Sequence, residues 1–112
     1  MVETNLDLQI AQARQAEALA AITEPRAVSA RYDIDTGLIV ITLKSGAVYS
    51  FPSAIAQGLT NAENSLLAEL EVTPSGDGLH WEALDVDFTV KGLLAGIFGT
   101  KAWMAELQKR WE

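Results

Sequence analysis

The residues best suited to chemistry lie in one short stretch, where His80 is followed by Trp81 and Glu82 and then by Asp85 and Asp87. Imidazole and carboxylate groups can transfer protons or ligate a metal ion. His80 is the single histidine of the chain, so a second histidine cannot complete a zinc site or a triad. A histidine beside a tryptophan is also typical of a hydrogen-bonded structural position. We expect structural or partner contacts here. The alternative is a small enzyme or a metal- or small-ligand-binding protein centred on His80, Asp85 and Asp87.

Two other motifs fail on spacing. The segment from Asp33 to Gly37 begins like a calcium loop, but the sixth and twelfth positions are Leu38 and Lys44 instead of glycine and glutamate. The segment Gly96–Lys101 differs from a phosphate-binding loop because Thr100 separates its glycine from its lysine. The chain has no cysteine for a thiolate site. We therefore expect no cofactor, no metal site and no enzymatic activity.

Charge and hydropathy narrow the function further. The 112 residues contain 8 Lys and Arg against 15 Asp and Glu, a formal net charge of −7. An acidic chain is a poor match for nucleic acid or an anionic membrane, since neutralising phosphates requires clustered Lys and Arg. Apolar runs stay short of the roughly 18 residues that a membrane span needs, and the first residues lack the pattern of a signal peptide. We expect a cytoplasmic protein.

The chain before Pro25 predicts a helix over residues 5–22, rich in Ala, Gln and Leu. Its apolar side chains are mostly small, so the helix alone is marginal and must dock on its own domain or on another copy. Pro25 ends this extension because proline disfavours helical geometry at the residue before it. Residues 1–112 are expected to be a single domain, with 1–23 as an N-terminal helical extension.

Strand patterns follow. Apolar residues alternate with polar ones from Val28 to Ile34, the period of a half-buried strand. The run Leu38–Leu43 is typical of a central strand covered on both faces, and a third strand is predicted from Ala47 to Phe51. Turns containing Gly37 and Gly46 separate the three. The pattern predicts a three-stranded antiparallel meander.

The second half predicts mainly helices. A helical turn is expected at 54–57, then a helix through about Ala68 after a capping box from Thr60 to Glu63. Strands are predicted over 69–73 and, as a last short one, over 79–81. Thr89 is the expected N-cap of a helix over 90–98, with Asp85 or Asp87 as alternative caps. The final helix, after Thr100, carries one apolar face of Trp103, Met104, Leu107 and Trp111. The predicted class is α+β, an antiparallel meander with an N-terminal helix and C-terminal helices packed on it.

The segment Gly78–Gly96 resembles the signature of an uncharacterised bacterial family, DUF2442. It has the order Gly-apolar-His-Trp, then Leu84-Asp85, an acidic residue, a threonine and a Gly-Leu-Leu helix. Similar features upstream are Phe51-Pro52 and the Ala-Gln-Gly-Leu turn at 56–59. The resemblance covers residues 24–107, and the early helix is similar to an extension found in a longer subgroup.

The resemblance implies a small α+β domain with an antiparallel sheet and carries no catalytic residues. Some family members are encoded beside a small partner in what are thought to be toxin–antitoxin pairs, and others carry a helix-turn-helix domain, for which we expect no room before Glu112. We expect a non-enzymatic protein–protein interaction module, antitoxin-like or regulatory, that forms homo-oligomers or binds a small toxin-like protein. Its candidate motif and interaction residues are His80, Trp81, Leu84, Asp85, Asp87 and Trp111. Trp111 is the interface candidate because it stands next to the C-terminus and tryptophan is enriched at interface hot spots.

Overall fold

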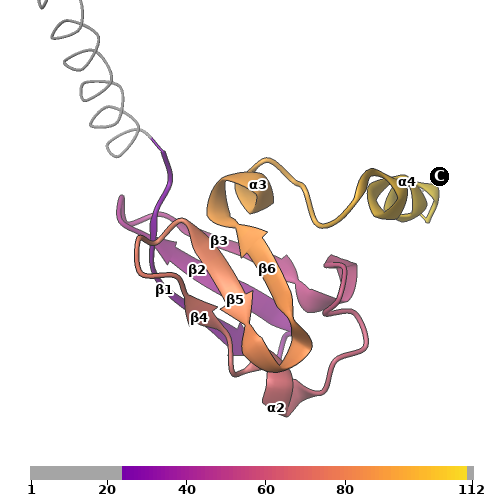
Figure 1. Ribbon diagram of the computed structural model, residues 1–112, viewed down its shortest axis with the longest axis horizontal. Coiled ribbons are helices and arrows are strands. Elements are labelled where there is room, and N and C mark those ends of the chain that lie inside the picture. Colours follow the sequence, from indigo (N-terminus) through magenta and orange to yellow (C-terminus); the bar gives the residue numbers. More distant parts are fainter. Residues whose placement is uncertain (1–23, 111–112) are drawn as a thin grey trace, which may run out of the picture.

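Two small antiparallel sheets stacked as layers form the body of the protein in the computed structural model, which describes residues 24–110 (Figure 1). Each sheet has three strands in sequence order, so each is a meander. The class is therefore mixed helix and sheet, as predicted, but with two meanders instead of one. The predicted helix at 5–22 and the terminal Trp111 lie outside the described residues.

The first sheet consists of β1 (Ala27–Asp33), β2 (Leu38–Leu43) and β3 (Val48–Pro52). All three predicted strands are confirmed, and Gly37 takes the positive φ of +73° that its turn requires. Central strand β2 turns Ile39 and Ile41 inward, where both are fully buried. Its register places Ile39 opposite Phe51 of β3, another core residue. The alternation predicted along β1 places Ala30 and Tyr32 against the core, but Val28 and Ile34 are 56% and 62% exposed. Val28 departs from the pattern at a register shift between Ala27 and Ser29.

The outer face of this sheet differs from the prediction. Val28 and Val48 are 56% and 64% exposed, and Val40 is half-buried. Within the part of the chain that the structure describes, β2 is fully buried on one face instead of both. The apolar run of β2 carried no sign of this difference, because a strand covered on one face can still be apolar on the other.

The second sheet consists of β4 (Glu71–Val72), β5 (Gly78–Trp81) and β6 (Val86–Thr89). The expectation that 79–81 is the last strand is wrong, since β6 follows it. A 3-10 turn, η2 (Glu82–Leu84), and the left-handed Asp85, with φ of +52°, reverse the chain between β5 and β6. After that reversal Val86 and Phe88 alternate with polar residues, the two-residue period of a strand.

The helices are shorter than predicted. A 3-10 turn, η1 (Ser53–Ile55), precedes α2 (Asn64–Leu67). The predicted capping box from Thr60 to Glu63 is absent at the start of α2. Thr60 donates its hydroxyl to the carbonyl of Ala56, and the N-cap residue Glu63 makes no side-chain capping bond.

The last two helices begin where the sequence predicted. Thr89 caps α3 (Val90–Leu94) by accepting from the Gly92 N–H, so neither alternative aspartate serves as the cap. The helix ends before Phe98 because Gly96, with φ of +82°, forms a Schellman motif. The last helix, α4 (Lys101–Lys109), is capped by Thr100 as predicted.

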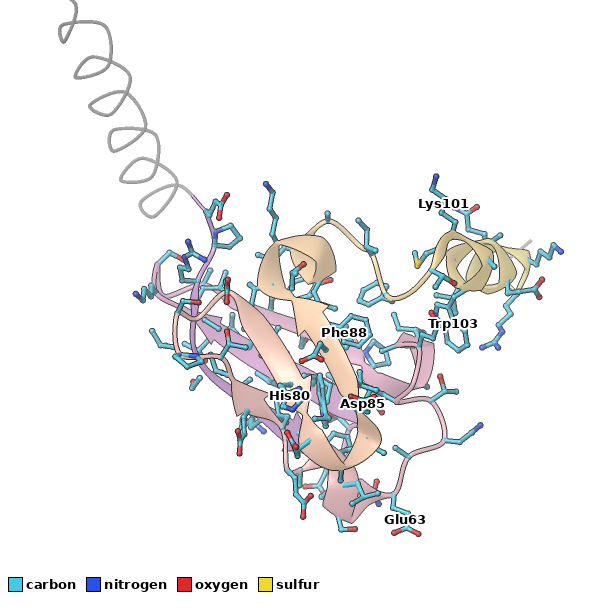
Figure 2. All side chains as sticks on the ribbon, in the orientation of Figure 1. Glu63, His80, Asp85, Phe88, Lys101 and Trp103 are labelled. Atoms are coloured by element: carbon cyan, nitrogen blue, oxygen red, sulfur yellow. The ribbon has the colours of Figure 1, made fainter. Side chains whose placement is uncertain are left out.

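The core lies between the two sheets and at the helix contacts. Trp81 is the largest fully buried side chain, and its indole N–H donates to the carbonyl of Leu67 in α2. Trp103 of α4 points toward the body (Figure 2) and donates to the carbonyl of Ile55, which ties that helix to η1. No helix within residues 24–110 is long and apolar enough to cross a membrane.

Candidate functional site

The candidate residues lie on the β5–β6 hairpin of the second sheet. Antiparallel register places His80 of β5 directly opposite Asp87 of β6 and, on the other side, opposite Glu71 of β4. Side chains opposite one another on one face of a sheet lie close enough to interact. Residues seven positions apart in the chain therefore become neighbours through the hairpin.

Two carboxylates hold the His80 ring. Its Nδ1 lies 2.5 Å from Oδ1 of Asp87, and its Nε2 lies 2.6 Å from Oε2 of Glu82. The His80 side chain is 28% exposed, whereas those of Glu82 and Asp87 are 90% and 69% exposed. Ionised carboxylates only accept hydrogen bonds, so both ring nitrogens donate when both contacts form, and the ring is then an imidazolium. The bond to Glu82, followed by the bond to Asp87, raises the pKa of His80 above its ordinary value.

This arrangement decides what His80 is suited to do. A metal ligand needs a neutral imidazole with a free lone pair, and a general base needs the same lone pair. With both N–H groups donated to carboxylates, His80 offers neither, and it joins β5, η2 and β6 by charge-assisted bonds. Among the described residues, no group of three or more His, Asp and Glu side chains is placed to hold a metal ion.

The other candidates divide into different environments. Trp81 is a core residue, 1% exposed, with Phe88 packed edge-on at 6.2 Å between ring centroids. Leu84 and Asp85 line a groove along β6, to which Asp87 also belongs, and make no hydrogen bond to His80 among the described residues. The structure therefore brings His80, Glu82 and Asp87 into one hydrogen-bonded cluster, in which Asp85 takes no part.

The groove has a volume of about 630 Å³ and follows β6 along its length. This volume is within the range of ligand-sized clefts, roughly 300–1,000 Å³. Residues 84–89 form one side of the groove, and the opposite side comes from segments remote in sequence. The remote lining residues, which the sequence analysis did not select, are Gln57, Gly58, Gly92, Ile97, Gly99 and Thr100.

Close backbone contacts hold the remote side in place. A Cβ on Gly58, whose φ is +88°, would lie 2.6 Å from Cγ2 of Val86, so this glycine lets the 56–59 turn press against β6. The Oε1 atom of Gln57 accepts from the Thr100 N–H at 2.8 Å and joins the turn to the start of α4. The sequence signal that could have identified this side is the Ala-Gln-Gly-Leu turn, which served only for the family resemblance.

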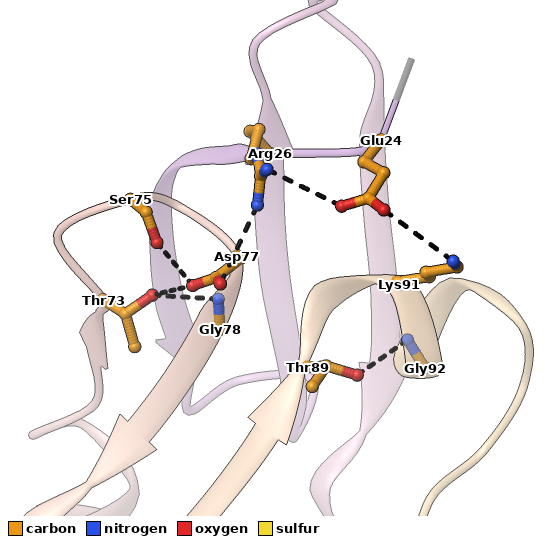
Figure 3. A network of polar contacts seen from close by, with 9 residues as sticks. All are labelled: Glu24, Arg26, Thr73, Ser75, Asp77, Gly78, Thr89, Lys91 and Gly92. Atoms are coloured by element: carbon orange, nitrogen blue, oxygen red, sulfur yellow. Dashed lines mark hydrogen bonds and ion pairs between the residues drawn. The ribbon is translucent and has the colours of Figure 1, made fainter. Parts of the chain in front are cut away.

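A second polar cluster lies at the opposite end of the second sheet (Figure 3). Asp77 accepts from Ser75 at 2.7 Å and from Thr73 at 2.8 Å, and these bonds lower the pKa of its carboxyl. Arg26 lies 3.8 Å from Asp77 and 3.6 Å from Glu24. The cluster joins the entry to β1 with the β4–β5 loop, which is a structural role.

Comparison with known proteins gives relatives but no activity. The profile of the family described as "Protein of unknown function (DUF2442)" matches residues 27–99, and no functionally curated protein matches the chain. A crystal structure of a protein of unknown function from Rhodospirillum rubrum ATCC 11170 is 50% identical, with a TM-score of 0.71, over 73% of this chain and 99% of that one.

A second similar structure, solved by solution NMR, is an uncharacterised protein from Chromobacterium violaceum. It is 33% identical with a TM-score of 0.68 and covers 89% of this chain and 90% of its own. The profile match spans the first sheet, the β5–β6 hairpin and the groove side that contains Gly58 and Ile97. The chain belongs to the DUF2442 family.

Proposed function

We propose that the protein is a non-enzymatic protein–protein interaction module. The observation that carries the proposal is the open groove beside β6, whose surface is mainly apolar and one side of which is a sheet edge. An apolar surface gains free energy when a partner removes it from water. The groove's titratable side chains are Asp85 and Asp87, and the histidine nearest to it is engaged by carboxylates.

The alternative is a small enzyme or a metal- or ligand-binding protein centred on His80, Asp85 and Asp87. That function requires the His80 ring to release at least one of its two carboxylates. Adding Zn²⁺ while following the His80 ring protons by NMR tests this directly. A saturable change of these signals, together with zinc binding by calorimetry that is lost in His80→Ala, supports the alternative, and an unchanged ring contradicts metal binding at His80.

Self-association is part of the proposal, and its candidate surface is the outer face of the first sheet. Val28, Val40 and Val48 supply exposed or half-exposed apolar area there. Ala30 and Tyr32 pack on the core, so the alternation of β1 places Arg31 and Asp33 on this same outer face. Two copies related by a two-fold axis can pair Arg31 of each with Asp33 of the other, which is the self-complementarity that such a dimer requires.

Sedimentation equilibrium of the full chain, over a concentration range that reaches high micromolar, tests the self-association. We expect a monomer–dimer equilibrium that Val48→Lys weakens on the order of tenfold, because a lysine would replace an exposed apolar side chain of the contact face. Ile97→Lys is the matched control, since Ile97 is a comparably exposed apolar residue, 53%, on the groove instead of the sheet face. A wild-type monomer at all concentrations contradicts this part of the proposal.

An antitoxin-like or regulatory role is the finer form of the proposal, and it comes from the family resemblance. A net charge of −7 would complement a basic protein partner and speed the encounter with it. The proposal places the protein in the cytoplasm, in agreement with a chain that has no cysteine.

A further inference from the structure

The strand β6 is an edge of the second sheet, which has the order β4-β5-β6 (Figure 1). An edge strand carries backbone N–H and C=O groups that point away from its sheet and can pair with another chain. The groove follows this edge, because residues 84–89 are among its lining. What can occupy the groove therefore depends on which backbone groups of β6 are free.

Two hydrogen bonds identify the free groups. The N–H of Val90 donates to the carbonyl of Asp77 at 2.8 Å, and the carbonyl of Gly78 accepts from Thr73 of the β4 side at 2.9 Å. In an antiparallel pair, the residues that exchange bonds with a given neighbour alternate along the strand. The backbone N–H and C=O groups on the β5 side therefore point toward β6 at Asp77, Leu79 and Trp81. Those on the β6 side point toward β5 at Val86, Phe88 and Val90. The N–H and C=O of Asp87 point outward into the groove.

Side chains along the edge follow the same alternation. Val86 and Phe88 are half-buried on the core side, whereas Asp85 and Asp87 are exposed on the other face. Ile97 of the opposite side is 53% exposed and adds an apolar contact. An added strand that alternates basic and apolar residues would place its basic side chains beside Asp85 and Asp87. Its apolar side chains would then lie beside Val86 and Phe88.

The charge of the groove favours a strand from another protein over a second copy of this chain. Pairing two β6 strands edge to edge would bring the carboxylates of Asp85 and Asp87 near their own counterparts, and like charges opposite one another destabilise a sheet. Lys and Arg are absent from the groove lining among the described residues. A basic segment meets opposite charge along the edge, and a second copy meets repulsion.

We infer that the groove binds an extended, basic segment of a partner protein, which adds to β6 as the fourth strand of the second sheet. This inference rests on the proposed interaction function and names the partner's chemistry at the groove. Backbone bonds to Asp87 supply the register. Lys or Arg side chains supply the charge pairing, with Asp85 and with the Oδ2 atom of Asp87, whose Oδ1 bonds His80. The contact between Gly58 and Val86 and the bond from Thr100 to Gln57 keep the groove preformed, so little free energy is lost to ordering it.

The test uses the full chain labelled with ¹⁵N and two capped hexapeptides, Thr-Lys-Val-Lys-Val-Thr and Thr-Glu-Val-Glu-Val-Thr, titrated by NMR. We expect saturable shifts of the amide signals of residues 85–89 and 97–100 with the lysine peptide, and on the order of tenfold weaker binding of the glutamate peptide. Raising the salt concentration should weaken binding of the lysine peptide, because the charged groups are exposed.

Variants locate the binding. Asp85→Asn removes one charge while keeping a residue that tolerates φ of +52°, and it should weaken binding about two- to fivefold, as expected for one exposed charge pair. Ile97→Arg should weaken it more than about tenfold by repelling and obstructing the segment. Val48→Arg is the matched control on the other sheet and should leave binding unchanged, provided that both variants keep the wild-type circular dichroism.

Shifts spread over the whole acidic surface, equal binding of the two peptides, or equal binding by Ile97→Arg and wild type would each overturn the inference. So would a dimer that Ile97→Arg dissociates and Val48→Arg does not, because the edge would then pair with a second copy. If the peptide fails to bind while the outer face still dimerises, the edge assignment fails and the interaction function stands. If neither occurs, both fail.

Discussion

Replacing Gly58 by alanine tests how the groove is built. Gly58 has φ of +88°, and a Cβ there would lie 2.6 Å from Cγ2 of Val86. Alanine pays about 1–2 kcal/mol for left-handed geometry, and forcing a methyl group into a packed contact costs typically 1–3 kcal/mol. We expect Gly58→Ala to lower the free energy of unfolding by about 2–4 kcal/mol.

The chain provides a control that separates the two costs. Gly46 has φ of +93°, and a Cβ there meets nothing within 4 Å. Gly46→Ala should therefore lower the free energy of unfolding through the backbone conformation alone. The expected loss is about 1 kcal/mol, because alanine also lowers the entropy of the unfolded chain and so offsets part of the cost. The difference between the two variants measures the contact with Val86.

Urea unfolding followed by tryptophan fluorescence measures the free energies, with the slope of unfolding against urea checked for two-state behaviour. In a double-mutant cycle, Val86→Ala should cost less in the Gly58→Ala background than in the wild type, because it removes the obstructing methyl group. Equal losses for Gly58→Ala and Gly46→Ala, or additive effects in the cycle, would refute the claim that Gly58 is required for close approach to β6.

Two further predictions concern the hairpin and its helix. The pKa of His80, followed by NMR, should lie above about 6.5 and should fall in Glu82→Gln, because the bond to Glu82 favours the charged ring. The stability that this contact contributes should be complete below the unfolded-state pKa and should disappear as the pH rises through the folded-state pKa. A lower pKa in the wild type than in the variant contradicts the assignment. Thr89→Ala should lower the free energy of unfolding by about 1 kcal/mol through loss of the cap bond to Gly92, whereas Thr60→Ala, which removes no cap, should cost less in the same urea assay.

Local patterns predicted much of the fold. The alternation along β1, the apolar run of β2 and the glycine at position 37 identified the first meander, and the threonine at position 89 identified the start of α3. These features act through neighbours in the chain or through one neighbouring strand. The capping-box prediction at Thr60 failed because α2 begins at Asn64 with Glu63 as its N-cap residue, so Thr60 does not stand at the helix start. The Thr60 hydroxyl donates to the carbonyl of Ala56 instead.

The candidate site was predicted in part. His80 and Asp87 do meet, but Glu82 completes the contact instead of Asp85. The sequence analysis ended the strands at Trp81 and considered Asp85 and Asp87 as helix caps, because four residues of alternation are too few to outweigh a helix cap next to them. Once β6 is recognised as a strand, its alternation places Asp87 on the exposed face, opposite His80, with Val86 and Phe88 on the core face.

The sequence by itself determined the family, the acidic charge, the first meander and the presence of one histidine among carboxylates. These depend on residue types and on short periods along the chain. The tertiary structure alone decided that β6 closes the second sheet as its edge, that this edge faces Gly58 and Ile97, and that the outer face of β2 is left partly exposed. Each of these depends on contacts between segments separated by tens of residues, and no local pattern records which remote segment will occupy a given face.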